Sequence, residues 1–250
     1  MARVIAVSNN KGGSAKSTTV INVSAELAKL GQKVLAVDLD SQGHVSEGFG
    51  IPALSLEHEL SDVMGGSLPL QDIVQEVRPN LSLAPANLRL SYLEPQLITR
   101  IGRENVLKKV LDPALSTYDF VLIDCPPSLG IFTVNAFAAS DEVLIPMAAE
   151  FFALVGVSLL LDSLSLVRSG LSHDVGVLGI VPTRVTRTAH AREVIEQAMG
   201  QLGEHYRFFD PIPEAVAVRD ASAAGVPVAE YQPASPAAKA YHELAKEILA

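Results

Sequence analysis

The chain has 250 residues, of which 48% are hydrophobic and 19% charged, and its formal net charge is −9. This composition excludes a disordered chain, which would be poorer in apolar residues and richer in charge. The negative net charge argues against a uniformly basic nucleic-acid-binding surface but is compatible with a local basic patch. The single cysteine, Cys125, excludes an internal disulfide. Because the N-terminus has no leader pattern and no apolar run has the length of a membrane span, we expect a cytoplasmic protein.

Strand-like and helix-like segments alternate along the chain. The expected strands cover 3–8, 33–38, 81–86, 119–124, 142–147 and 175–182. The expected helices cover 17–30, 129–139, 151–169, 189–202 and 235–249. The strands are nearly continuous in Val, Ile and Leu, which is typical of strands buried on both faces. The sequence therefore predicts an α/β fold, a doubly wound and mostly parallel sheet with helices on both faces, in one domain over 1–250. No separate helix-turn-helix domain is expected before it.

The first motif, SNNKGGSAKSTT at residues 8–19, joins the first expected strand to the first expected helix. A loop in this position presents backbone N–H groups and a helix N-terminus to an anion. The phosphate-loop pattern G-x-x-x-x-G-K-[ST], aligned on Lys16 and Ser17, puts its two glycines at Asn10 and Ala15. Ala15 is the larger departure, because its methyl group lies where the backbone must wrap closely.

The loop keeps backbone freedom at Gly12 and Gly13, and Lys16 is placed to reach the β and γ phosphates of a nucleotide. We predict a nucleotide site, while a glycine-rich turn with a surface lysine is the alternative. The predicted nucleotide-binding residues of the loop are Lys11, Gly12, Gly13, Ser14, Ala15, Lys16, Ser17 and Thr18.

Two further motifs follow expected strands. DLDSQGH at 38–44 places carboxylates at the end of the second strand, where ligands bind in parallel sheets. An acidic turn that is capped by its own side chains is the alternative for this segment. YDFVLIDCPPSLG at 118–130 is an apolar strand ending in Asp124, which has the form of a Walker B motif. Asp124 would hold magnesium through water while Ser17 ligates it directly. We expect Cys125 to be a small buried residue.

These motifs together resemble a known family. KGGSAKS at 11–17 fits the K-G-G-x-x-K-[ST] loop of the deviant Walker ATPases. With the 38–44 and 118–130 motifs, the chain resembles the ParA/Soj partition ATPases of the MinD/ParA superfamily of P-loop ATPases. The likeness continues through 150–164 and 211–248 and so covers nearly the whole chain. One departure is Ser41, which stands where that family has proline in D-x-D-P-Q-G.

The resemblance implies roles for individual residues. Lys11 would act across a dimer interface on the partner's phosphates, Lys16 would bind its own nucleotide, and Asp40 would position the attacking water. Magnesium would involve Ser17, Asp124 and Asp40. The implied switch residues are Asp38, Gln42, Gly43 and Pro126. The adenine pocket is expected near Thr183–Arg184 and 211–213, including Pro213.

The resemblance also implies a function. ATP, with Mg²⁺, would drive formation of a homodimer that binds double-stranded DNA without sequence preference. A ParB-like or other cargo adaptor would stimulate a slow ATP hydrolysis, and the cycle would segregate or position a plasmid, a chromosome origin or a protein body. The protein would be associated with the nucleoid in the cytoplasm, and no membrane partner is expected.

Arginines late in the chain are the candidates for DNA contact, because non-specific affinity comes from cations on phosphates. Where many ParA relatives read IPRNVR, this chain reads IPEAVA at 212–217, so that Glu214 and Ala217 replace two arginines. A solvated surface with ion pairs to Glu193 and Glu196 is the alternative. The candidates are Arg184, Arg187, Arg192 and Arg219, with Arg168 and Arg207 as secondary ones.

Other functions remain open on the sequence alone. A MinD-like positioning ATPase would need a membrane-binding C-terminal helix, and the stripe Tyr241, Leu244, Ala245, Ile248 is better explained by core packing. A nitrogenase-type iron protein is excluded, because one cysteine per chain gives a dimer too few thiolates. A small-molecule kinase or ligase of the same fold stays possible, as does a non-hydrolysing nucleotide-binding scaffold with Ala15 as the suspect residue.

Overall fold

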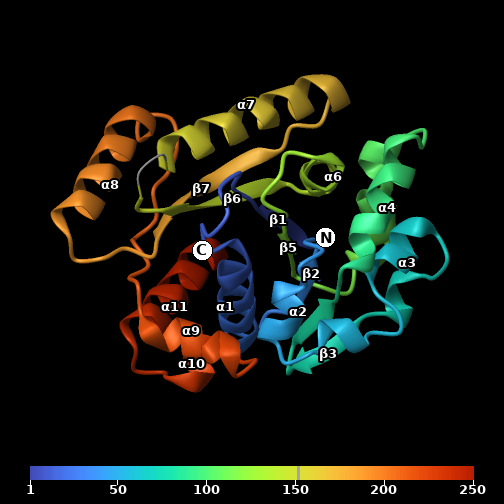
Figure 1. The fold of residues 1–250 in the computed structure, drawn as a ribbon, viewed down its shortest axis with the longest axis horizontal. Helices are drawn as coiled ribbons and strands as arrows, with labels where there is room; N and C mark the ends of the chain where they lie inside the picture. The colour runs from blue at the N-terminus through green and yellow to red at the C-terminus, as the bar shows by residue number, and fades with distance from the viewer. Residues whose placement is uncertain (151–152) are drawn as a thin grey trace.

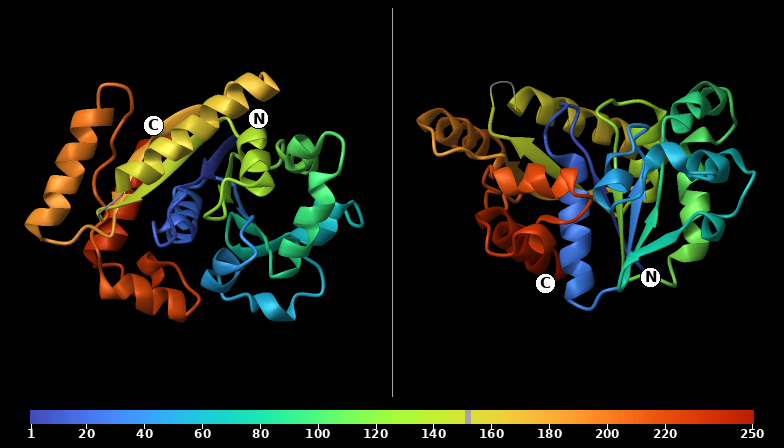
Figure 2. Two further views of the ribbon diagram at one scale, coloured as in Figure 1. Left: turned by 45° about the horizontal axis from the view of Figure 1, so that its top comes forward. Right: turned by 60° about the horizontal axis from the view of Figure 1, so that its bottom comes forward.

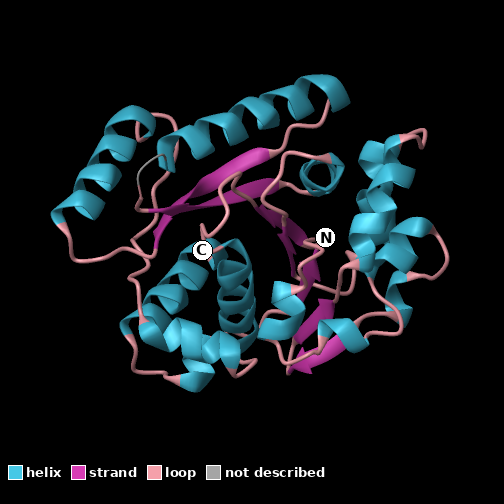
Figure 3. Ribbon diagram, viewed as in Figure 1, coloured by secondary structure: helices cyan, strands magenta, loops and turns pink. Residues whose placement is uncertain are grey.

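The computed structural model describes residues 1–150 and 153–250. Its centre is one seven-stranded sheet in the order β3-β4-β2-β5-β1-β6-β7 (Figure 1, Figure 3). All neighbouring strands are parallel except β3, which runs antiparallel to β4 at one edge. The strands are β1 Arg3–Val7, β2 Val34–Asp38, β3 Gln75–Arg78, β4 Leu81–Ala84, β5 Phe120–Asp124, β6 Glu142–Ala148 and β7 Gly176–Thr183.

Helices cover both faces of this sheet, as the turned views in Figure 2 also show. One face carries α3 Leu60–Gly65, α4 Arg89–Ile98, α5 Val106–Leu111, α6 Ile131–Ala139 and α7 Ala153–Leu171. The other carries α1 Lys16–Lys29, α2 His44–Gly48, α9 Val216–Ala223, α10 Val228–Tyr231 and α11 Pro236–Leu249. Helix α8, Ala189–Leu202, stands beyond the β7 edge (Figure 1). The predicted α/β class with a mostly parallel, doubly covered sheet is confirmed.

Burial on both faces explains the apolar strands. In β1, Val4 and Ala6 belong to the core under α6 and α7, whereas Ile5 and Val7 belong to the core under α1 and α11. Successive side chains of a strand point to opposite faces, so a strand between two helical layers needs an apolar residue at each position. The unbroken Val, Ile and Leu runs in the sequence therefore indicate a hydrophobic core on each face of the sheet.

The expected elements are all present, with ends that differ by at most a few residues. The expected start of the 151–169 helix lies outside the described residues, and α7 is described from Ala153. The sequence patterns predict no helix for the segments that form α2, α3, α4, α5, α9 and α10, and no strand for β3. Most of these helices are short, and Pro95 lies inside α4, so their periodic signal is weak.

The expectation that no apolar run has the length of a membrane span needs correction. Among the described residues, α7 has 19 residues and a mean hydropathy of 1.5, long and apolar enough by these criteria to cross a bilayer. Its inner face, which includes Val157, Leu160 and Leu164, packs into the core over the sheet. Core helices of globular proteins pass the same test, because burial against a sheet demands the same apolar residues.

The C-terminal helix packs inside the protein. Tyr241, Leu244 and Ile248 on α11 are at most 2% exposed and belong to the core that α1 shares. His242 Nδ1 lies 2.7 Å from Glu26 Oε2 on α1, which adds a polar contact at the edge of this packing. The stripe is therefore a core face, as the sequence predicted, and its burial argues against a membrane-binding role for this helix.

Candidate nucleotide site

The strand order brings the three motifs together at the carboxyl ends of the central strands. Strand β5 lies between β1 and β2, and its Asp124 is in register with Val7 on one side and Asp38 on the other. The loop after β1, the turn after β2 and the segment after β5 therefore start side by side. The strand order reverses near β1, since β2 lies on one side of it and β6 and β7 on the other, and α/β proteins form ligand crevices at such points.

Side-chain donors hold three successive carbonyl groups of the loop after β1. The Gly13 carbonyl accepts from Arg184 at 3.2 Å, the Ser14 carbonyl from Thr183 Oγ1 at 3.0 Å, and the Ala15 carbonyl from Thr19 Oγ1 at 2.7 Å. In a trans peptide the following N–H points away from the carbonyl. The N–H groups of residues 14–16 are thereby directed away from these three partners, as an anion-binding loop requires.

The backbone at Ala15 explains why glycine is usual there. Ala15 has φ 65° and ψ 31°, the left-handed region, and forms the N-cap of α1. An alanine in that region costs about 1–2 kcal/mol. Gly13 has φ 76°, whereas a Cβ at Gly12 would meet no atom within 4 Å. The loop thus adopts the left-handed turn despite its methyl group, with the strain concentrated at one residue.

Lys16 and Asp124 are two buried titratable groups beside this loop. Burial lowers the pKa of Lys16, and the negative charges of Asp124 and Asp40 act in the opposite direction. Burial, and after it the Asp38 charge, raises the pKa of Asp124 well above its ordinary value. Within the described residues neither carboxylate oxygen of Asp124 has a partner in good hydrogen-bond geometry, although the nearby Ser17 hydroxyl acts to lower its pKa. Such groups are costly without a further cation or ligand.

Asp38 is a buried carboxyl held by one neighbour. Its Oδ2 accepts the Ser46 N–H at 2.9 Å and the Ser46 Oγ–H at 2.8 Å. Burial raises the pKa of Asp38 to about 7, although the Ser46 bonds act against this rise. The two carboxyls of this motif accept the Asp40 and Gln42 N–H groups within the turn, so the turn is capped by its own side chains. Asp38 also anchors α2 through Ser46, which a self-capped turn alone does not do.

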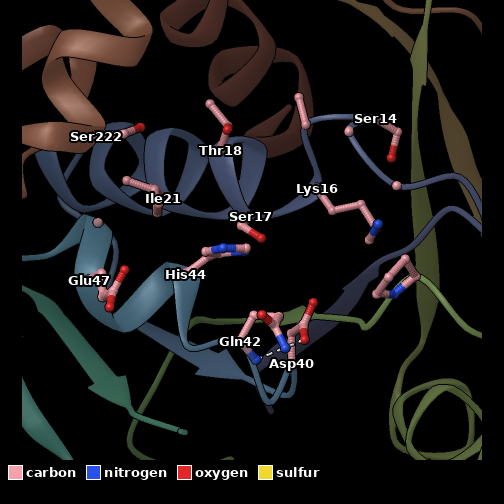
Figure 4. Close-up of a pocket in the computed structure, with 15 residues that line it drawn as sticks. Ser14, Lys16, Ser17, Thr18, Ile21, Asp40, Gln42, His44, Glu47 and Ser222 are labelled. Atoms are coloured by element: carbon pink, nitrogen blue, oxygen red, sulfur yellow. Dashed lines mark hydrogen bonds between the residues drawn. The ribbon is translucent and has the colours of Figure 1, made fainter. Parts of the chain in front are cut away.

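Asp40 and Gln42 face the cavity beside the loop (Figure 4). Asp40 Oδ1 accepts the Gln42 N–H at 3.0 Å, which fixes the turn. Gly43 has φ 68°, and a Cβ there would lie 2.9 Å from Ala53 Cβ and 3.0 Å from the Ala86 carbonyl. Position 43 therefore requires glycine for its torsion and for its space.

A cavity of about 420 Å³ lies over the loop (Figure 4). Loop residues, Asp40, Gln42 and Pro127 line it. Pro126, predicted as a switch residue, is half-buried just before Pro127. A second cavity of about 410 Å³ shares Gly13, Ala15, Thr18 and Ser222 with the first and is lined by Ile212, Pro213, Val218 and Tyr241 among others. Pro213 therefore lies next to the phosphate loop, where the sequence placed an adenine pocket.

The residues present fit a magnesium ion. Mg²⁺ uses one or two carboxylates together with water and substrate phosphates, so a protein cage is not needed. Among the described residues no group of three or more His, Cys, Asp or Glu side chains is arranged to hold a metal by itself. Ser17 acts on the pKa of Asp124, and Ser17 and Asp40 line the cavity, so magnesium binding by these three residues stays a prediction that their chemistry allows.

The four arginines predicted to bind DNA fall into two places. Arg184 has φ 52°, bonds the Gly13 carbonyl, and forms ion pairs with Glu150 and Glu214. Arg219 lines the second cavity. Arg187 and Arg192 are exposed at the start of α8, and within the described chain neither pairs with Glu193 or Glu196. DNA binding stays a prediction for all four.

The two secondary arginines already have partners. Arg168 donates to the Val175 carbonyl at 2.7 Å, and Arg207 pairs with Glu247 and lies over the Phe209 ring. Cys125 is fully buried, and burial raises the pKa of its thiol, which confirms its expected role as a packing residue.

Several contacts that support the site were not predicted from the sequence. Thr183, expected near an adenine pocket, fixes the Ser14 carbonyl, and Asn9 of the 8–19 motif accepts the Lys11 N–H while donating to the Pro146 carbonyl. Ser46 holds Asp38, and Glu150, after β6, pairs with Lys11 at 2.8 Å. Ser46 and Glu150 lie outside the three motifs, so no local pattern pointed to their roles.

Comparison with known proteins adds to this geometry. The family model AAA_31, described as an AAA domain, matches residues 2–177. The sporulation initiation inhibitor protein Soj of Bacillus subtilis is 38% identical over 252 residues, covering 100% of this chain and 99% of that protein. The chromosome-partitioning ATPase Soj of Treponema pallidum is 39% identical and covers 100% of this chain and 98% of its own.

Solved structures of nucleotide-bound proteins are also similar to this chain in fold and sequence. Cobyrinic acid a,c-diamide synthase from Mycobacterium smegmatis with a bound ATP analogue and magnesium has a TM-score of 0.85 and 33% identity, covering 100% of this chain and 95% of that one. The septum site-determining protein MinD from Pyrococcus horikoshii with Mg-ADP has a TM-score of 0.80 and 26% identity over 99% of this chain and 96% of its own. With its lysine-bearing phosphate loop and the aspartates beside it, the chain belongs to the ParA/Soj family of partition ATPases, with the MinD/ParA fold.

Proposed function

We propose that this ATPase works as an ATP-driven dimer switch that binds DNA and positions a cargo. The observation that carries the proposal is a cavity of about 420 Å³ that Lys16 and Asp40 line, with Lys11 in the same loop as Lys16 and Asp124 at the carboxyl end of the neighbouring strand β5. Two lysines and two carboxylates suit a nucleotide triphosphate with its magnesium. The relatives named as partition ATPases support the cellular role.

Nucleotide binding follows from the loop. The N–H groups of residues 14–16 and the N-terminus of α1 bind the phosphates, and the Lys16 ammonium neutralises the β and γ phosphates. Bound Mg²⁺ would neutralise part of the negative charge of the triphosphate. Ser17, Asp124 and Asp40 would hold it, directly or through water. The adenine would occupy the second cavity, next to Pro213.

Hydrolysis is assigned to Asp40 and Lys11. The Asp40 carboxylate, oriented by the Gln42 N–H, positions the attacking water near the γ phosphate. Lys11 of a second copy stabilises the charge that develops on the transferred phosphoryl group, as an arginine finger does. Since a single copy lacks that lysine at its own γ phosphate, turnover is slow until the dimer and a cargo adaptor complete the site.

The dimer is tested by sedimentation with a non-hydrolysable ATP analogue and Mg²⁺. The wild type should form a dimer with the analogue and remain monomeric with ADP. Lys11→Ala should bind the nucleotide normally and remain monomeric. A Lys11→Ala protein that dimerises like the wild type would disprove the role of this lysine across the interface.

DNA binding is assigned first to two exposed arginines, Arg187 just before α8 and Arg192 in its first turn. Helix α8 stands beyond the β7 side of the sheet (Figure 1). Two copies would double the number of cations and so make binding depend on ATP. Each phosphate contact contributes about 0.9 to the slope of log affinity against log salt. Arg187→Ala should lower the slope of the ATP-bound dimer by about 1.8, one contact per copy. Arg78→Ala, on β3 at the opposite edge, is the control and should leave the slope unchanged.

The adaptor, a ParB-like or other cargo-bound protein, would stimulate hydrolysis and thereby release the dimer from DNA. The protein would then be cytoplasmic and associated with the nucleoid in its ATP state. Pull-down from the native host with the ATP-locked Asp40→Ala protein, followed by an ATPase assay with the candidate, tests this part. A true adaptor raises the turnover of the wild type in the presence of DNA.

A second candidate is a small-molecule ligase or kinase of the same fold. It is favoured by the 33% identity to a structure named as cobyrinic acid a,c-diamide synthase. In that case Lys11 and Asp40 would act on a small substrate instead of a partner and water. ATP-dependent dimerisation with DNA binding supports the partition switch. Adenylate or phosphate transfer to a corrinoid carboxylate by a protein that ignores DNA would support the ligase.

A further inference from the structure

The charged groups at the mouth of the phosphate loop form a cluster that joins three segments. Lys11 lies in the loop after β1, Glu150 follows β6, and Arg184 follows β7. Lys11 Nζ lies 2.8 Å from Glu150 Oε2, and Arg184 NH1 lies 3.4 Å from Glu150 Oε1. Each oxygen of the Glu150 carboxylate thus faces a different cation.

The position of Lys11 is fixed at both ends. Its backbone N–H donates to Asn9 Oδ1 at 3.0 Å, and the Asn9 amide donates to the Pro146 carbonyl on β6 at 2.7 Å. Its ammonium is directed to Glu150 at the end of the same strand. The hydrogen bond from Lys11 lowers the pKa of Glu150, so the carboxylate is charged at neutral pH. In a single copy, the lysine is therefore held against its own subunit.

We propose that Glu150 is a positioning residue that holds Lys11 within its own subunit and so sets the threshold for ATP-dependent dimerisation. This inference rests on the proposed function, in which Lys11 acts on the nucleotide of a second copy. To do so, Lys11 must leave Glu150. Arg184 stays beside Glu150 and bonds the Gly13 carbonyl, so the carboxylate keeps a cation and the loop keeps its tether after Lys11 has left.

The size of the effect follows from the exposure of the pair. The Lys11 and Glu150 side chains are 30% and 47% exposed, so solvent screens their attraction. An exposed pair of this kind shifts an equilibrium by about fivefold at most. A symmetric dimer breaks two such pairs, one in each copy. Removal of both therefore shifts the dimer dissociation constant by up to about 25-fold, enough to set a concentration threshold without preventing dimerisation.

The test compares Glu150→Gln with Glu142→Gln. Glu142 begins the same strand, pairs with Arg3 at 2.7 Å and lies at the end of β6 remote from the loop. Dimer dissociation constants are measured by sedimentation with a non-hydrolysable ATP analogue and Mg²⁺, after circular dichroism has shown that both variants are folded. Glu150→Gln should dimerise about 5–25-fold more tightly than the wild type, and Glu142→Gln should stay within about twofold.

A rescue variant and a double variant separate positioning from other roles. Glu150→Asp restores the charge and should return the constant toward the wild type. In a Lys11→Ala background, Glu150→Gln should change neither self-association nor nucleotide affinity, because nothing remains to be released. Weaker dimerisation of Glu150→Gln, or a constant equal to that of Glu142→Gln, would overturn the inference.

The failure of this inference and the failure of the proposed function give different results. If Lys11→Ala dimerises with the ATP analogue as the wild type does, the proposed function fails. If Lys11→Ala remains monomeric but Glu150→Gln does not tighten the dimer, only the positioning role of Glu150 fails.

Discussion

Replacement of Asp38 by asparagine tests the electrostatics of the site through stability alone. Burial raises the pKa of Asp38 from 3.8 to about 7 in the folded protein. Between these values the folded state holds a proton that the unfolded state has lost. The free energy of unfolding therefore falls as pH rises from about 4 to about 7, and the loss is complete above the folded pKa. The full difference corresponds to about 4 kcal/mol at 1.36 kcal/mol per pKa unit.

Asp38→Asn removes this titration and keeps most of the local bonding. Both Ser46 bonds are on Oδ2, so the asparagine carbonyl can accept them, while its NH₂ group meets only the Asp40 N–H, 3.4 Å from Oδ1. The free energy of unfolding of the variant minus that of the wild type should therefore increase by about 3 kcal/mol as the pH rises from 5 to 8.

Urea unfolding at several pH values, without nucleotide or magnesium, measures this difference. Constant m-values would show that the compactness of the two states is unchanged. Parallel stability curves for the wild type and the variant over pH 5–8 would refute the reasoning, since they would mean that Asp38 is ionised in the folded protein at pH 5.

Three further outcomes test the geometry of the site. Gly43→Ala should lower the stability by about 2–4 kcal/mol in urea unfolding, from its left-handed torsion and its contacts with Ala53 and Ala86, whereas Gly12→Ala should change it by less than about 0.5 kcal/mol. Lys16→Ala should weaken ATP binding about 100-fold in calorimetry, and an unchanged affinity would exclude a phosphate contact. Asp40→Ala should slow hydrolysis at least about 100-fold while the dimer persists, and an unchanged phosphate release rate would exclude its role.

Local patterns in the sequence determined the parts of the site that lie next to each other in the chain. The loop residues 11–18 and the acidic ends of two strands were readable because phosphate binding demands particular residues at fixed spacing on a strand, a loop and a helix N-terminus. The burial of the sheet on both faces could also be predicted, because a strand between two helical layers must be apolar at every position.

The tertiary structure alone decided which distant residues support that site. The order β2-β5-β1 places Asp38, Asp124 and the phosphate loop side by side, and burial then raises the pKa values of both aspartates. Glu150 contacts Lys11, and Arg184 contacts Gly13. Both contacts form only because the carboxyl ends of β6 and β7 lie beside the carboxyl end of β1. These contacts join residues more than a hundred positions apart, so they depend on strand order and register, which no local pattern encodes.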